Sequence, residues 1–216
     1  MALDLDGTLY PELFMNLRSI PFVLTHARLL LALEKARIEL RNQGPVLEFN
    51  RMQAEKVGRI LGINPGRAYA LIEQKIYKQW FKLFTKVKPF PGLAETLGRL
   101  KTAGLKLAVM SDFPIRNRLR DMGLDGYWTT VFSSEETGAL KPRPEAFHRL
   151  ALELGCEPSK ILYVGNSYRY DILGAKRAGF LAAHLTSRPP SDSLADFSFK
   201  NYEELENYIF RCLAKS

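Results

Sequence analysis

The chain has 216 residues, 46% hydrophobic and 25% charged, which is the ordinary composition of a soluble globular protein with one large domain or one domain carrying a smaller insertion. Its cysteines, Cys156 and Cys212, have no metal or redox spacing, and no stretch approaches ~18 uninterrupted apolar residues, so the composition excludes a disulfide framework and a membrane span. The net charge is +8, and a charge as early as Asp4 argues against a signal peptide, so we expect a cytoplasmic protein.

The first element is a short strand that ends in acidic residues, in the segment LDLDGTLY (residues 3–10). Asp4 and Asp6 alternate at strand spacing, and Gly7 lets the chain turn away. Two crowded carboxylates repel each other unless a cation or a shared proton relieves them. A cation would leave Asp4 ionised as a nucleophile, and Asp6 could act as an acid or a base. The alternative is a solvated turn that happens to contain acids.

Residues 13–88 form the next unit, for which we predict helices and no strand. The helical stretches are 19–43, 48–62 and 65–84, and a linker with two prolines and a glycine follows at 86–92. The segment has 14 Lys or Arg against 5 Asp or Glu, a net charge of +9, so the rest of the chain has a net charge of −1. We interpret it as a small inserted helical domain. Its positive charge suits anionic substrates, although a solvated helical surface is the alternative.

From residue 89 onward, strands and helices alternate. The expected strands are 105–112, one that begins the segment 128–138 and is followed there by a loop, 160–167 and 180–187. The expected helices are one from Leu93, then 115–123, 144–155, 171–179 and 201–215. This alternation predicts an α/β fold in which a parallel, Rossmann-like sheet is built from residues 1–12 and 89–216, with residues 13–88 inserted. Ligands of such sheets bind at the carboxyl ends of the strands.

Further polar residues follow these predicted strands. Ser111 and Asp112 end one strand, Lys141 comes just before a helix, and Asn166 and Asp171 follow the strand 160–167. Ser111 and the backbone N–H of Asp112 could bind an anionic oxygen. Each residue alone is a weak signal. Together, on neighbouring strand ends of one sheet, they indicate a functional site.

These segments resemble the motifs of the haloacid dehalogenase-like hydrolase superfamily, over essentially the whole chain. DLDGTLY is similar to the first motif, VMSD (109–112) to the second, Lys141 in LKPRPEAF to the third, and VGNSYRYDILGAKRAG (164–179) to the fourth. The helical insertion resembles the small cap domain of that family. The resemblance implies a hydrolase that removes phosphate from a small phosphorylated metabolite through an aspartyl-phosphate on Asp4.

The resemblance also implies roles for single residues. Asp6 would protonate the leaving oxygen and then activate water, and Ser111 and Lys141 would hold the phosphoryl oxygens, beside Asp112 as a further substrate-binding residue. Mg²⁺ would be the cofactor. It would be held by Asp4, the backbone carbonyl of Asp6, and the fourth motif through Asn166 and Asp171.

Asn166 departs from the family pattern, because an acid that ligates magnesium commonly stands there. An amide oxygen can still bind a hard cation, so we expect a weakened metal site that still works. The alternatives are a catalytically weak or inactive binding or regulatory protein, and a carbon-centred hydrolase or phosphotransferase on the same scaffold. Nucleic-acid binding through the basic segment would be a variant of the regulatory alternative, and we do not favour it.

Overall fold

A six-stranded parallel sheet forms the centre of the computed structural model, which describes residues 1–79, 82–83, 85 and 87–214. The sheet order is β3-β2-β1-β4-β5-β6, which confirms the α/β fold class. The strands are β1 (Ala2–Leu3), β2 (Ala108–Ser111), β3 (Thr130–Ser133), β4 (Leu162–Gly165), β5 (Leu181–Leu185) and β6 (Phe197–Phe199). The sequence analysis missed β6, a three-residue strand too short for an alternating pattern.

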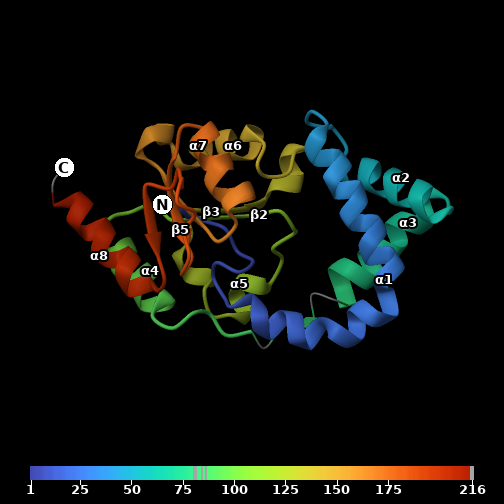
Figure 1. Cartoon of the computed structure of the whole chain (residues 1–216), viewed down its shortest axis with the longest axis horizontal. Coiled ribbons are helices and arrows are strands. Elements are labelled where there is room, and N and C mark those ends of the chain that lie inside the picture. The colour runs from blue at the N-terminus through green and yellow to red at the C-terminus, as the bar shows by residue number, and fades with distance from the viewer. Residues whose placement is uncertain (80–81, 84, 86, 215–216) are drawn as a thin grey trace.

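Helices cover both faces of the sheet (Figure 1). One face packs against α6 (Pro144–Leu154) and α7 (Leu173–Arg177), and the other against α4 (Leu93–Thr102) and α8 (Tyr202–Leu213). Successive strand residues alternate between the two apolar clusters, because side chains in a strand point to opposite faces. In β2, Met110 belongs to the cluster with α6, and Val109 belongs to the cluster with α4. The central strands β1 and β2 are therefore buried on both faces, whereas the edge strands β3 and β6 are partly exposed.

The helix ends follow local sequence signals, with two differences from prediction. α6 begins with Pro144 in its first turn and ends at Gly155, as predicted. The helix expected over 115–123 is reduced to α5 (Arg118–Asp121), because Arg116 has a φ of 48°, which is incompatible with a right-handed helix. The helix expected at 171 begins earlier, as the π-helical turn η6 (Tyr168–Ile172), and the remaining short turns are η3 (Asp125–Tyr127), η4 (Ser134–Thr137) and η5 (Pro158–Lys160).

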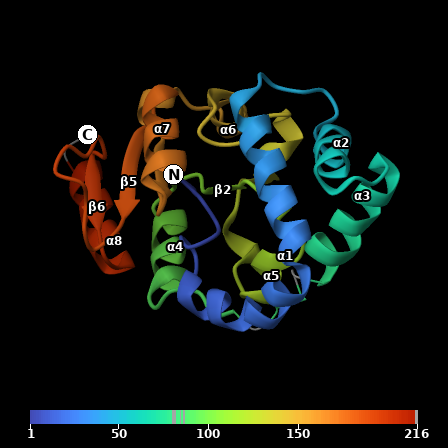
Figure 2. The same ribbon diagram turned by 45° about the vertical axis from the view of Figure 1, so that its right-hand side comes forward.

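The inserted segment is helical in its described residues and lies beyond one end of the sheet (Figures 1 and 2). It consists of α1 (Glu12–Asn42), α2 (Phe49–Leu61), α3 (Pro65–Leu71) and the π-helix η1 (Ile72–Gln79). We call these elements the cap. α1 contains Pro21, and the non-helical φ of −123° at His26 marks a kink. Residues 80, 81 and 84 of the third predicted helix, and residue 86 of the linker, lie outside the described residues.

The cap shares its apolar interior with the core. Leu29 and Leu33 of α1 belong to the same buried cluster as Leu97 of α4 and Val109 of β2. The division of the chain at residues 12/13 and 88/89 stays a prediction. Within the described residues, no helix combines the length and the apolar character that a bilayer crossing requires.

The close packing of α6 against α7 leads to a stability prediction. A Cβ atom added to Gly174 of α7 would lie 2.8 Å from two ring carbons of Phe147, whereas one added to Gly98 of α4 would meet only a Tyr127 carbon, at 3.9 Å. We predict that Gly174→Ala lowers the free energy of unfolding by about 1–3 kcal/mol through overpacking. Gly98→Ala, the matched control, should raise it by about 0.5–1 kcal/mol. Urea titration measures both, and an equal effect of the two would contradict this view of the interface.

Candidate active site

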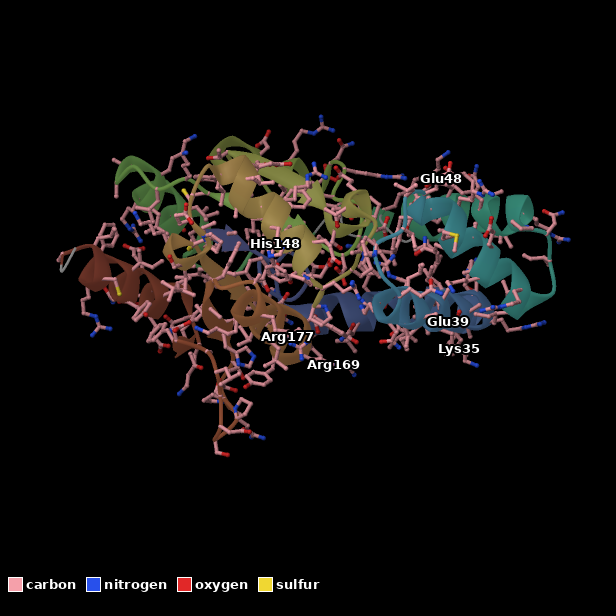
Figure 3. All side chains as sticks on the ribbon, turned by 90° about the horizontal axis from the view of Figure 1, so that it is seen from above. Lys35, Glu39, Glu48, His148, Arg169 and Arg177 are labelled. Atoms are coloured by element: carbon pink, nitrogen blue, oxygen red, sulfur yellow. The ribbon has the colours of Figure 1, made fainter. Side chains whose placement is uncertain are left out.

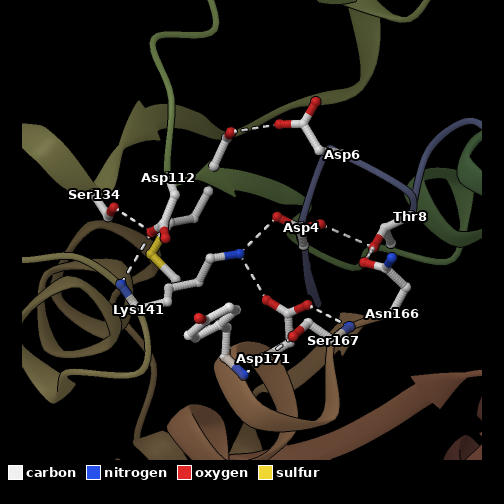
Figure 4. A network of polar contacts seen from close by, with 12 residues as sticks. Asp4, Asp6, Thr8, Asp112, Ser134, Lys141, Asn166, Ser167 and Asp171 are labelled. Atoms are coloured by element: carbon white, nitrogen blue, oxygen red, sulfur yellow. Dashed lines mark hydrogen bonds and ion pairs between the residues drawn. The ribbon is translucent and has the colours of Figure 1, made fainter. Parts of the chain in front are cut away.

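The residues predicted to carry chemistry lie at the carboxyl ends of the central strands. Asp4 directly follows β1, which pairs with both β2 and β4. Ser111 is the last residue of β2, and Asn166 comes directly after β4. The strand order therefore brings together three segments that are far apart in the sequence. Figure 4 shows Asp4 between Lys141 on one side and Thr8 and Asn166 on the other.

A buried ion triad occupies the centre of this site. Lys141 Nζ donates hydrogen bonds of 2.6 Å to Asp4 Oδ1 and 2.6 Å to Asp171 Oδ1. The exposed fractions are 3% for Lys141, 5% for Asp4 and 1% for Asp171. Two carboxylates share one ammonium, so the fully ionised triad has a net charge of −1. Burial raises the pKa of Asp4 to about 8; Lys141 opposes this rise, and Asp171 adds to it.

The second oxygen of Asp4 points toward Asn166. The Thr8 hydroxyl lies 3.0 Å from Asp4 Oδ2 and 3.2 Å from Asn166 Oδ1, and its single proton can be donated to only one of these acceptors at a time. The amide nitrogen of Asn166 donates to Glu12 Oε1 at 3.1 Å, which turns the amide oxygen toward Asp4. Gly7, with a φ of +77°, makes this possible, because a Cβ there would lie 2.3 Å from Asn166 Nδ2.

These oxygens are the candidate metal ligands. Asp4 Oδ2 and Asn166 Oδ1 converge on the Thr8 hydroxyl, and all the donors are hard oxygens of the kind that Mg²⁺ prefers. The donor set therefore fits a hard divalent cation, which would also offset the negative charge of the triad. The Asp171 carboxylate has other partners: its oxygens accept hydrogen bonds from Lys141 and from the backbone N–H of Ser167, and neither accepts from the Thr8 hydroxyl. The described residues contain no group of three or more His, Cys, Asp or Glu arranged to hold a metal.

Asp6 has a different environment from Asp4. Arg118 contacts both of its oxygens, Tyr10 donates to Oδ1, and Ser111 Oγ donates to Oδ2 at 3.1 Å. Burial acts to raise the pKa of Asp6, but Arg118 and the hydrogen bonds outweigh it and hold the pKa below its ordinary value. Asp6 is thus ionised, as a general base requires, and it must gain a proton before it can act as an acid.

The Asp112 side chain connects three segments of the chain by hydrogen bonds. Its carboxylate accepts hydrogen bonds from Ser134 Oγ at 2.6 Å, Lys141 N at 3.0 Å and Arg41 Nη2 at 2.9 Å. Burial acts to raise the pKa of Asp112, but the nearby cations Lys141, Arg41 and Arg37 outweigh burial. The net result is a pKa below the ordinary value. The Asp112 side chain therefore positions the Lys141 segment and α1, and it does not point at the Asp4 carboxylate.

The cap reaches the site through two arginines of α1. Arg37, only 1% exposed, forms an ion pair with Glu135 and donates to the Asp112 carbonyl. Arg41 bonds the Lys141 carbonyl at 3.1 Å in addition to Asp112. The sequence analysis did not single out these arginines, and helical periodicity alone carries no signal for them.

Other contributors were also missed. Thr8 and Tyr10 lie within the DLDGTLY segment, each four residues after the aspartate that it contacts, so this spacing could have identified them. Arg118 lies in the short helix α5, 112 residues after Asp6, and no local pattern marks it.

The triad leads to a stability prediction. In Lys141→Met, the buried carboxylates of Asp4 and Asp171 lose their common cation, which should lower the free energy of unfolding by about 3–5 kcal/mol near neutral pH. The pKa of Asp4 is about 8 in the folded wild type and would rise further in the variant. This penalty should therefore grow as pH increases above about 8, where Asp4 loses its proton in the folded wild type but keeps it in the variant.

Urea titrations at several pH values measure this dependence. Lys176→Met is the matched control, because Lys176 pairs with Asp196 at the surface, and it should cost about 0–1 kcal/mol. Adding Asp171→Asn to Lys141→Met should recover part of the loss. A penalty that does not change with pH would contradict the shared-cation interpretation.

Comparisons with known proteins agree with the family resemblance. A family model described as haloacid dehalogenase-like hydrolase matches residues 1–179. The chain is 36% identical over 142 residues to a glyceraldehyde 3-phosphate phosphatase of Methanopyrus kandleri, a match that spans 61% of this chain and 60% of that protein. It is 28% identical over 216 residues to a phosphoglycolate phosphatase of Haemophilus influenzae, covering 95% of each.

The fold is also found among solved structures. A 2-haloacid dehalogenase from Pseudomonas syringae pv. Tomato DC3000 superposes with a TM-score of 0.68 and 21% identity, covering 97% of each chain. At this identity the likeness shows the fold alone. It supports the arrangement of a parallel sheet with a helical cap.

Proposed function

The chain belongs to the haloacid dehalogenase-like hydrolases, and from this premise we propose that it is a magnesium-dependent phosphatase acting on a small phosphorylated metabolite. The observation that supports this most is the convergence of the predicted groups at the strand ends. Lys141 Nζ lies 2.6 Å from Asp4 Oδ1, and Ser111 Oγ lies 3.1 Å from Asp6 Oδ2. Burial raises the pKa of Asp4, so this nucleophile needs a cation beside it to stay ionised. The names of the two phosphatase relatives support the substrate class.

In the proposed reaction, Asp6 first takes up a proton from the solvent. The Asp4 carboxylate then attacks phosphorus and forms an aspartyl-phosphate, while the bond between phosphorus and the leaving alcohol oxygen breaks and that oxygen takes the proton from Asp6. Asp6, ionised again, then accepts a proton from the water that hydrolyses the acyl phosphate. Lys141 and Ser111 would hold the phosphoryl oxygens, once Ser111 gives up its hydrogen bond to Asp6. A bound Mg²⁺ would supply the charge that keeps Asp4 ionised beside an anionic substrate.

We propose that Asp4, the backbone carbonyl of Asp6 and Asn166 hold the metal, with Asp171 contributing its negative charge or an oxygen. Asp4 and Asn166 converge on one point, which supports this assignment. Direct ligation by Asp171 stays a prediction. The cytoplasmic location is also part of this proposal.

A binding or regulatory role without turnover is the second candidate. Asn166 favours it, because an amide replaces a charged ligand at the fourth strand end. Hydrolysis of an aryl phosphate with Mg²⁺, and its loss with a chelator, would support the phosphatase. Absence of turnover with every divalent metal would favour the regulatory role.

The nucleophile is tested by Asp4→Asn. We predict a loss of at least about 10³-fold in kcat, because the variant removes the attacking carboxylate and one metal ligand together. The protein should stay folded, since an amide oxygen can still accept from Lys141. Asp125→Asn, a change at an exposed site, serves as the control and should retain activity. Near-normal activity of Asp4→Asn would rule out covalent catalysis at this residue.

Asn166 and Asp171 give a separate test of the metal site. Asn166→Asp adds a negative charge to the metal site, so Mg²⁺ should bind about tenfold more tightly, a change of about 1.4 kcal/mol. The full Coulomb energy is about 4 kcal/mol at 4 Å and a dielectric of 20, but repulsion from Asp4 in the metal-free protein offsets most of it. Asp171→Asn should weaken Mg²⁺ binding more than any other substitution in its loop.

Glu12 provides the matched control, because the new carboxylate of Asn166→Asp would face Glu12 where the amide now donates to it. Adding Glu12→Gln should therefore increase the gain in affinity. Calorimetric titration with Mg²⁺ and the metal dependence of activity measure these effects. If Asn166→Asp and Asp171→Asn both leave Mg²⁺ binding unchanged, the fourth strand end is not part of the metal site.

A further inference from the structure

A hollow lies where the cap meets the core, and its walls contain none of the catalytic residues described above. Its volume is about 460 Å³. α1 contributes Ile38, Arg41 and Asn42. The start of α6 and the two residues before it contribute residues 142–144, and η6 and α7 contribute Arg169, Tyr170, Leu173 and Arg177. Arg169 and Arg177 lie near each other on this side of the molecule (Figure 3).

The hollow is strongly basic. Four arginines from three separate parts of the chain line it, and none of its lining residues is acidic. Arg143 pairs with Glu145, and Arg41 pairs with Asp112. Arg169 and Arg177 form no ion pair with any described residue. Like charges gathered in a hollow repel each other, and an anion bound between them removes that cost.

Arg41, which lines the hollow, has unfilled hydrogen-bonding capacity. Its Nε and Nη2 atoms are bonded to the Lys141 carbonyl and to Asp112. Its Nη1 atom is buried and has no hydrogen-bond partner among the described residues. The guanidinium lies over the Tyr170 ring at 4.6 Å, which fixes its plane. A buried donor without a partner is costly, so a ligand oxygen reaching Nη1 would be strongly favoured.

We propose that this hollow is a second anion-binding site, distinct from the Asp4 centre, that takes the phosphate group of a small molecule. A phosphate offers several acceptor oxygens to forked guanidinium donors, which is the chemistry that clustered arginines recognise best. The bound anion would contact Arg41, which donates a hydrogen bond to the Lys141 carbonyl. Arg41 would therefore connect the anion directly to the backbone of the catalytic lysine. Binding at this site does not depend on the proposed phosphatase activity.

The test is calorimetric titration with inorganic phosphate and, separately, phenyl phosphate, in a chelator and at constant ionic strength set with chloride. The chelator removes metal-dependent binding and turnover at Asp4. We expect the wild type to bind, and Arg169→Ala/Arg177→Ala to bind at least about tenfold more weakly, equal to about 1.4 kcal/mol. Arg211→Ala, a change on α8 at the far end of the molecule (Figure 1), should leave binding unchanged.

Ser111→Ala separates this site from the catalytic centre, and it should leave chelator-resistant binding intact. Binding of both probes, or of either one, supports the proposal and shows whether free phosphate or a phosphate ester is preferred. The proposal is overturned if the wild type binds neither probe at millimolar concentration. It is also overturned if the double variant binds as well as the wild type, or if Ser111→Ala loses the binding.

Discussion

The contact of Lys141 with two buried carboxylates is the interaction on which the rest of the site depends. All three charged groups are withdrawn from water, so each is tolerated only because the others are within hydrogen-bonding distance. The contact joins the end of β1, the loop before α6 and the turn after β4. Gly165 permits it, since a Cβ there would lie 2.3 Å from the Asp171 side chain. The excess negative charge of the triad explains why the site would favour a cation.

Arginines control the surroundings of this triad. Arg118 holds Asp6 ionised only two residues from Asp4, whose pKa is shifted in the opposite direction. Arg37 and Arg41 connect the cap to the strand ends, so α1 is bound to the same network that positions the lysine. A motion of the cap would have to break these buried contacts. The position of the cap and the geometry of the catalytic lysine are therefore linked physically.

The sequence was sufficient to predict the fold class and several of the polar residues that meet at the strand ends. Buried parallel strands have continuous apolar sequences, and their polar ends are visible as interruptions, so Asp4, Ser111 and Asn166 could be identified without coordinates. Glycine and proline marked the limits of α6 in the same way. These signals are local, since each depends on a few adjacent residues. Two elements of the fold differed from the prediction, and both differences have local causes. The positive φ of Arg116 shortened α5, and β6 has too few residues to show an alternating pattern.

Only the tertiary structure decided which charges pair. From the sequence, Asp171 was expected at the metal and Asp112 at the substrate. In the folded chain the Asp171 carboxylate holds Lys141, and that of Asp112 binds Arg41 from the cap. Arg118 could not be assigned to Asp6 from the sequence, because the two are separated by 112 residues. Hydrophobic patterning is periodic along the chain, but an ion pair depends on distance in space, and packing alone determines that distance.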